Sequence, residues 1–179
     1  MKTIKMRMKK LLSFATILLI GFYAQAQVIQ TDDFELTFPA EPKIDEQEIV
    51  TEAGDTHLKM YQLMHNGMMI LFTNATYPEG LDISTNKEVN KKVLKNSKNG
   101  SISNFAGQMG MEVTLVSEVF VEYKSLYGMR SIDRVGQYFG QVYTIAHLNK
   151  LYSILVFSEN EAEGKEVLDT LVDSFSLKI

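Results

Sequence analysis

QVYTIAHLNKLYSILVF, residues 141–157, is the longest apolar run of the chain outside the N-terminal segment. Its two halves, 142–148 and 151–157, are rich in β-branched and aromatic residues and flank Asn149-Lys150, which predicts a β-hairpin with a two-residue turn. The rest of the fold is expected to form around this hairpin. The predicted opposite pairs are Leu148 with Leu151, Ile145 with Ile154, and Val142 with Phe157.

Both faces of this predicted hairpin are apolar. One face collects Val142, Ala146, Leu148, Leu151, Leu155 and Phe157, and the other collects Tyr143, Ile145, Tyr152, Ile154 and Val156. Lys150 is poorly suited to the positive φ of a type I′ turn, so a three-residue loop with inverted pairing is a second possibility. Both faces stay apolar in either case, so we expect the hairpin at the centre of a sheet that is covered on both sides.

The N-terminal residues have the pattern of a secretory signal peptide. MKTIKMRMKK carries five Lys or Arg and no acid, an apolar run follows at 11–23, and Ala24-Gln25-Ala26 fits a cleavage site. A membrane anchor is the competing interpretation, but the apolar run is shorter than the ~20 residues needed to span a bilayer. We therefore expect residues 1–26 to be removed, and a single secreted domain, periplasmic or extracellular, to begin at Gln27 and end at residue 179.

The charge and cysteine content exclude several classes of protein. Without the signal peptide, 13 Lys and Arg stand against 22 Asp and Glu, so the chain carries about nine net negative charges. Non-specific nucleic-acid binding is therefore not expected. The chain has no Cys, so it must rely on its core rather than on disulfides, and no lipid is attached through a cysteine.

The remaining patterns predict further strands and two helices. Strands are expected at 34–38, at an acidic sheet edge 47–52, at 58–64 and 69–77 around Asn66-Gly67, at 112–123, and at 129–135 after Gly128. One helix is expected from a cap at Thr85 to Asn99-Gly100, and a second from a cap at Ser158, with an apolar stripe of Val167, Leu168, Leu171, Val172 and Phe175. These elements indicate an α+β protein.

Three short segments resemble the PsbP-like superfamily, which includes PsbP-type and DcrB-type envelope or accessory proteins. They are FELTFPAEP at 34–42, Gly140-Gln-Val-Tyr143, and Leu171-Val-Asp-Ser-Phe175. The resemblance implies an antiparallel β-sheet sandwiched between helices, an α/β/α arrangement. It also implies a non-catalytic protein that binds other proteins, and it carries over neither a catalytic motif nor a cofactor.

Catalytic machinery is not apparent in the sequence. The chain has three histidines, His57, His65 and His147, and it lacks a nucleophile elbow, a phosphate-binding loop and paired metal-ligand spacing. We therefore predict that the protein is not an enzyme and has no cofactor.

The stretch KMYQLMHNGMM at 59–69 suggests a copper site, because thioether and imidazole ligands suit Cu(I). Hairpin geometry opposes this interpretation, because Met64 and Met69 share one face whereas His65 and Met68 share the other. Met60 lies about 13 Å along the strand from Met64. Core filling is the preferred role, and a carrier of a small ligand or copper, using this hairpin or a pocket between sheet and helix, is the alternative function.

A row of lysines is the candidate partner-binding site. Residues 86–99 hold five Lys and one Glu, and the row comprises Lys87, Lys91, Lys95 and Lys98. These lysines are predicted to face solvent, opposite Val89 and Val93, and a solvated helix face without function is the competing interpretation. We expect a secreted, non-enzymatic binding or accessory module whose partner is another protein or an anionic envelope component.

Overall fold

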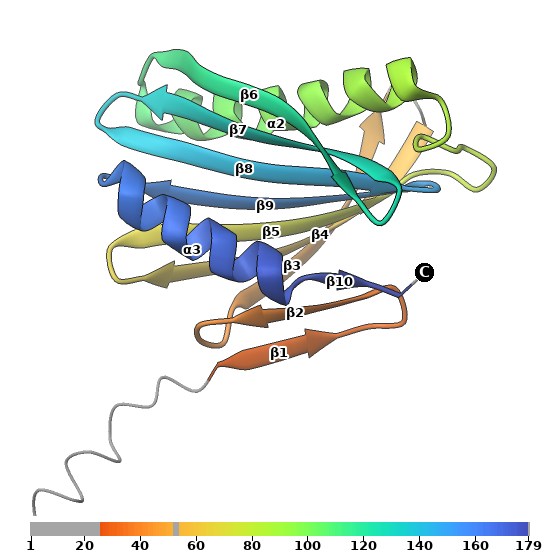
Figure 1. Ribbon diagram of the computed structural model, residues 1–179, viewed down its shortest axis with the longest axis horizontal. Helices are drawn as coiled ribbons and strands as arrows, with labels where there is room; N and C mark the ends of the chain where they lie inside the picture. Colours follow the sequence, from red (N-terminus) through yellow and green to blue (C-terminus); the bar gives the residue numbers. More distant parts are fainter. Residues whose placement is uncertain (1–25, 52–53, 179) are drawn as a thin grey trace, which may run out of the picture.

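The computed structural model describes residues 26–51 and 54–178, which form an α+β fold of antiparallel sheets and two helices (Figure 1). The predicted signal peptide therefore lies outside the described residues except for Ala26. The strands are β1 (Gln27–Gln30), β2 (Phe34–Phe38), β3 (Lys43–Thr51), β4 (Gly54–His65), β5 (Met68–Thr76), β6 (Val113–Tyr123), β7 (Leu126–Val135), β8 (Tyr138–His147), β9 (Lys150–Ser158) and β10 (Ser176–Leu177). The helices are α2 (Lys87–Met109) and α3 (Glu161–Ser174).

Seven strands form one large sheet in the order β3-β4-β5-β9-β8-β7-β6, and every neighbouring pair in it is antiparallel. A smaller sheet has the order β1-β2-β10. The hairpin β8-β9 lies in the middle of the large sheet, as the sequence predicted, and β3 and β6 are its two edges. Figure 1 shows the small sheet and α3 on one side of the large sheet and α2 on the other.

The central hairpin has the predicted faces, but its turn is one residue earlier than expected. Residues 148–149 form the turn and His147 pairs with Lys150, so all three predicted pairs are wrong. The residues opposite Leu151, Ile154 and Phe157 are Ala146, Tyr143 and Gly140, respectively. The shift moves the pairing by an even number of residues, so each side chain keeps its face. Leu148 itself adopts φ 54° and lies exposed in the turn.

The two faces of the hairpin pack against different layers. Toward α2, Ala146 and Leu151 contact Leu94, whereas Val142 and Phe157 lie in a second cluster with helix residues further along α2. Toward α3, the hairpin side chains join an aromatic core with strands of the small sheet. That core contains Phe34, Phe38, Tyr61, Phe72, Tyr143, Ile145, Tyr152, Ile154, Val156, Leu168, Leu171 and Phe175.

Both helices begin at a different cap from the predicted one. Asn86 caps α2 and Asn160 caps α3, each by accepting two backbone N–H groups through its side chain. Helix α2 also continues through Gly100 to a left-handed Gly110, whereas the sequence predicted an end at Asn99-Gly100.

The extension of α2 depends on tertiary packing. Ile102 is buried against β8 and β9, and it has room there because Gly140 lacks a side chain. A Cβ on Gly140 would lie 2.6 Å from Ile102 Cδ1 and 2.9 Å from Phe157 Cε1. The packing energy of this turn outweighs the local preference of Asn-Gly to end a helix.

The other hairpins agree with the sequence in part. Asn66 and Gly67 form the β4-β5 turn with positive φ at both residues, as predicted. Strand β7 begins before Gly128 rather than after it, because the turn lies at Lys124-Ser125. The acidic strand predicted at 47–52 is β3, and it is an edge of the sheet as expected.

Candidate functional site

Strand β6 is an edge of the large sheet, and within the described residues it pairs only with β7. A bulge between Leu115 and Ser117 leaves Val116 without an opposite residue, and the side chains of 113–117 are all exposed. Leu115, Val116 and Val119 are 53%, 51% and 55% exposed, respectively. An edge strand that offers unpaired backbone groups and apolar side chains is suited to pair with another chain.

The opposite edge, β3, is protected by charge. His57 Nδ1 of β4 lies 2.8 Å from Glu48 Oε1, and Lys59 Nζ lies 2.6 Å from Glu46 Oε1. The hydrogen bond from Lys59 lowers the pKa of Glu46 and raises that of Lys59. Charged side chains along an edge discourage the addition of another strand, so β3 does not resemble β6 in this respect.

The predicted lysine row lies over β6 and β7. The expectation that the row faces solvent is wrong for Lys98, which is buried, whereas Lys87 and Lys95 are exposed. The expectation that Val89 lies on the buried side of the helix is also wrong. Lys87 Nζ lies 5.0 Å from the ring centre of Tyr127, and Lys91 Nζ lies 5.4 Å from that of Phe120. Val89 is exposed instead. The buried side of α2 consists of Asn90, Leu94, Lys98, Ile102 and Ala106, at a spacing of four residues.

Lys98 is buried in an ion-pair network and is only 4% exposed. Its Nζ lies 3.2 Å from Asp133 Oδ1 and 3.7 Å from Glu118 Oε2. Lys95 Nζ contacts the other oxygen of Glu118 at 2.5 Å, and Ser131 donates a hydrogen bond to Asp133 at 3.2 Å. Two lysines and two carboxylates thus balance in charge and hold α2 to β6 and β7.

The α3 side of β7 also carries a cation. Arg130 forms an ion pair with Asp169 of α3, and Asp169 accepts a second contact from Lys165 at 2.6 Å. The hydrogen bonds from Lys165 and Arg130 lower the pKa of the Asp169 carboxyl. Arg130 is the residue opposite Val119, so positive charge lies next to the free edge on this face as well.

The residues considered as copper ligands lie on opposite faces of the β4-β5 hairpin, as its register predicts. Met64 pairs with Met69 on the α2 side of the sheet, whereas His65 pairs with Met68 on the α3 side. Met60 lies opposite Thr73, away from Met64. Among the described residues, the structure has no group of three or more His, Asp or Glu side chains placed to hold a metal ion.

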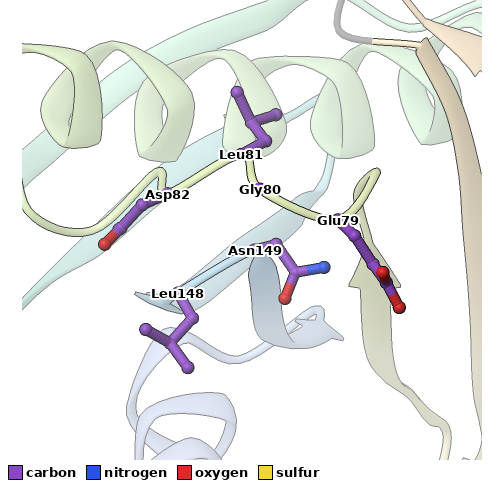
Figure 2. A pocket seen from close by; sticks show the side chains of 6 residues that line it. All are labelled: Glu79, Gly80, Leu81, Asp82, Leu148 and Asn149. Atoms are coloured by element: carbon purple, nitrogen blue, oxygen red, sulfur yellow. The ribbon is translucent and has the colours of Figure 1, made fainter.

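A small cavity of about 270 Å³ lies where the loop after β5 meets the central turn (Figure 2). Ile83 donates its backbone N–H to the Leu148 carbonyl at 2.9 Å, and Leu148 donates its own to Ser84 Oγ at 3.1 Å. These bonds hold Leu148 in its positive-φ conformation. The cavity is lined by Glu79, Gly80, Leu81, Asp82, Leu148 and Asn149.

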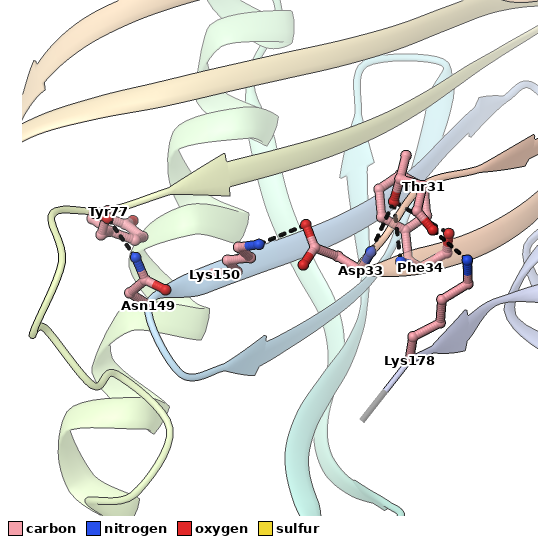
Figure 3. Close-up of polar contacts among 7 residues, drawn as sticks. All are labelled: Thr31, Asp33, Phe34, Tyr77, Asn149, Lys150 and Lys178. Carbon is pink, nitrogen blue, oxygen red and sulfur yellow. Dashed lines mark hydrogen bonds and ion pairs between the residues drawn. The ribbon is translucent and has the colours of Figure 1, made fainter.

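Polar contacts join the small sheet to the same end of the large one (Figure 3). Asn149 donates through its side chain to the Tyr77 carbonyl at 2.7 Å, and Lys150 Nζ contacts Asp33 Oδ2 at 2.5 Å. Lys178 donates to the Thr31 carbonyl. These contacts fasten the elements at this end of the fold to one another.

Sequence reasoning found the lysines but missed the edge beside them. Strand β6 was predicted from its composition, yet its position at the edge depends on the order of strands in the sheet. The sequence did carry one signal of a strand with apolar residues on both faces. VTLVSEVF has apolar residues at both odd and even positions, and it lacks the Gly or Pro that breaks strands.

No family model matches the chain, and no curated protein sequence matches it. A solved structure is similar, namely cyanobacterial PsbP (CyanoP) from Synechocystis sp. PCC 6803, with a TM-score of 0.56. The identity is 15%, and the match covers 86% of this chain and 93% of that chain. The chain therefore has a PsbP-like fold, which confirms the predicted resemblance at the level of fold, whereas the DcrB-type relationship stays a prediction.

One further property of the described residues concerns membranes. Neither α2 nor α3 combines the length and the apolar character that a membrane-spanning helix requires.

Proposed function

We propose that the protein is a secreted, non-enzymatic accessory module, a single domain over residues 27–179, that binds another protein of the cell envelope. The partner supplies an extended segment that pairs with the free edge of β6. The lysines of α2 contact acidic side chains of that segment. The exposed apolar edge of β6 is the observation that carries this proposal.

The fold supports a binding role. The similar protein of known structure is a PsbP, and the PsbP-like fold suggests an accessory or binding module. Fold alone does not define the partner, so the argument rests on the surface that this chain presents.

The surface around β6 favours an acidic partner segment. Lys87 and Lys91 lie beside the aromatic residues of β6 and β7. The side chains of Lys87 and Lys95 are exposed, and that of Lys91 is partly exposed. Lys98 is buried, so its role is to hold Glu118 and Asp133 and thereby the position of the edge. An added strand with apolar and acidic residues in alternation would meet the exposed valines and these cations.

Site-directed photo-crosslinking tests the location of the site. A photoreactive phenylalanine analogue is placed at Val119 in β6 or, as the matched control, at Val50, which is 86% exposed on the β3 edge. In cells that produce the full-length chain, we expect a discrete crosslinked partner from position 119 and none from position 50. Mapping the crosslinked peptide should give a segment with alternating apolar residues. Equal yields from both edges, or no crosslink from β6, would disprove the proposal.

A charge reversal then tests the lysines against the mapped segment. Lys87→Glu should weaken binding of the corresponding synthetic peptide by about 3- to 10-fold at low salt and by less at high salt, because surface charges are screened. Lys43→Glu, on the β3 edge, should leave the affinity unchanged. If the two reversals have the same effect, the partner responds to net charge and not to the lysine row.

A further inference from the structure

A second cavity, of about 410 Å³, lies between α3, the end of β2 and the β4-β5 turn. We propose that it is a binding site for a small organic cation with an apolar body, such as an aryl-alkyl amine. This site is separate from the β6 edge and does not depend on the protein-binding function. Its lining comprises Ala26, Thr37, Phe38, Pro39, His65, Asn66, Met68, Glu166, Val167, Thr170, Leu171 and Ser174.

The floor of the cavity is apolar and fixed. Phe38, Met68 and Leu171 are buried members of the aromatic core, and Val167 packs against them. The volume lies in the range of small-molecule sites, which bind an apolar body and orient it with a few polar groups. An apolar ligand body would therefore be removed from water without any rearrangement of the core.

Two of the three hydroxyl groups at the cavity, those of Ser174 and Thr170, are already engaged. Ser174 Oγ donates to the Leu171 carbonyl at 2.9 Å and accepts from the Thr37 N–H at 3.2 Å. Thr170 Oγ1 donates to the Glu166 carbonyl at 2.9 Å. Neither hydroxyl is thus the group that would select a ligand.

Four polar side chains of the lining are available to a ligand. Within the described part of the chain, the side chains of Thr37, His65, Asn66 and Glu166 have no hydrogen bond or ion pair. Glu166 is the acidic member of this set. A carboxylate above an apolar floor recognises a positively charged group attached to an apolar body.

The surroundings strengthen the preference for positive charge. Helix α3 carries five acidic residues and one lysine, Lys165, which is bound to Asp169. The cavity lies against the second half of α3, where the helix dipole is negative. An anionic ligand would therefore be repelled by the same helix that attracts a cation.

Three probes of one size test the proposal on the protein produced from the full-length chain. They are phenethylamine, 2-phenylethanol and phenylacetate, and their binding is measured by protein-detected NMR of the backbone amides and by calorimetry. We expect the amine to bind about 10-fold or more tightly than the alcohol and the acid, which corresponds to one charge-assisted contact. The amide resonances of Thr37 and Met68 should shift on binding.

Variants of α3 separate this site from a general attraction of cations. Glu166→Gln should reduce the preference for the amine to about 3-fold or less, whereas Asp173→Asn, on an exposed turn outside the cavity, should leave it intact. Thr170→Trp, at an exposed position of the lining, should fill the cavity and weaken all three probes. Intact mass is recorded, because it shows whether Ala26, which is one of the lining residues, is still present in the protein used.

Each alternative outcome contradicts the proposal. If phenylacetate binds as well as the amine, or if Glu166→Gln retains the full preference, Glu166 does not select the ligand. If no probe shifts Thr37 or Met68, the cavity does not bind this class of molecule. The β6 proposal is unaffected by these results, because the cavity and the edge share no residue.

Discussion

The two faces of the seven-stranded sheet are packed by different chemistry. Under α3, aromatic rings pack against one another: the ring centres of Phe34 and Phe72 lie 4.9 Å apart in an edge-to-face arrangement, and the Phe72 ring is nearly parallel to that of Tyr152. Under α2, two small apolar clusters are accompanied by buried polar residues. Those polar residues are Asn90, Lys98, Ser131, Asp133, Thr144 and Ser153.

This difference indicates which layer supplies stability and which supplies specificity. Burying aromatic surface is favourable in any arrangement, so the α3 side contributes most of the hydrophobic free energy. Buried ion pairs contribute little net stability, but one partner without the other is costly. The α2 side therefore fixes the position of α2, and with it the shape of the β6 edge, more than it stabilises the fold.

The largest expected effect is a charge placed in the aromatic face. Ile154→Asp puts an unpaired carboxylate in the core under α3, where the side chain is 1% exposed, and should unfold the domain. The cost is several kcal/mol against a total of ~5–15 kcal/mol. Ile154→Val, which keeps the site apolar, should cost only about 1 kcal/mol. Thermal melts by circular dichroism measure both, and an unchanged melt for Ile154→Asp would contradict the described core.

A slightly smaller effect is expected on the α2 face. Lys98→Met leaves Asp133 buried with Ser131 as its remaining partner, and should cost about 3–5 kcal/mol. The double variant Lys98→Met with Asp133→Leu removes both charges and should recover most of that loss. Denaturant unfolding gives the two values. If the double variant stays as unstable as the single one, the network contributes net stability and the contrast between the faces is smaller than inferred.

The next effect is a loss of stability at high pH, and it comes from a tyrosine in the aromatic core under α3. Burial raises the pKa of Tyr143 to about 12, so the folded state favours the neutral phenol. The unfolded phenol titrates near 10, so this stabilisation is complete below pH 10 and is lost as the pH rises toward 12. Between pH 9 and 12 the free energy of unfolding should therefore fall by about 2 kcal/mol less in Tyr143→Phe than in the wild type. Denaturant unfolding across this pH range measures the difference.

A matched variant on the other face tests the assignment of that alkaline effect. Tyr138 packs edge-on against Phe105, at 6.0 Å between ring centres, on the α2 side. Tyr138→Phe removes a phenol hydroxyl on that face and serves as the comparison for Tyr143→Phe. If both variants reduce the alkaline fall in the free energy of unfolding equally, that fall does not come specifically from the tyrosine buried under α3.

The sequence predicted the centre of the fold because its main signal does not depend on register. Both faces of 142–157 are apolar, so an error of one residue in the turn left the face assignments intact except that of Leu148, which lies in the turn. The true turn depends on Ile83 and Ser84, which hold Leu148 from 64 or more residues away in the chain. Local turn preferences contain no information on such contacts.

The candidate site was predicted less well for a related reason. Helical spacing identified the lysines as one row, but the charged partners of Lys98 are Glu118 and Asp133, which come from strands that follow the helix. Without these carboxylates a buried lysine is implausible, so the row was assigned to solvent. The helix cap shows the same limit, because Thr85 and Asn86 both suit the role and the structure uses Asn86.

The smallest effect concerns the ion pair that ties α3 to the edge half of the sheet. Arg130 and Lys165 lower the pKa of Asp169, so their stabilisation is present above the unfolded value near 3.9 and is lost as the pH falls through the folded one. Because the groups are partly exposed, Asp169→Asn should cost about 1 kcal/mol or less at pH 7. The free energies of unfolding of wild type and variant should become equal near pH 2. At pH 7, the difference between them should be smaller in about 0.5 M salt. Asp173→Asn, exposed on the same helix, serves as the control and should change neither value. If Asp169→Asn costs the same at pH 2 as at pH 7, the aspartate acts through packing, and charge does not link α3 to β7.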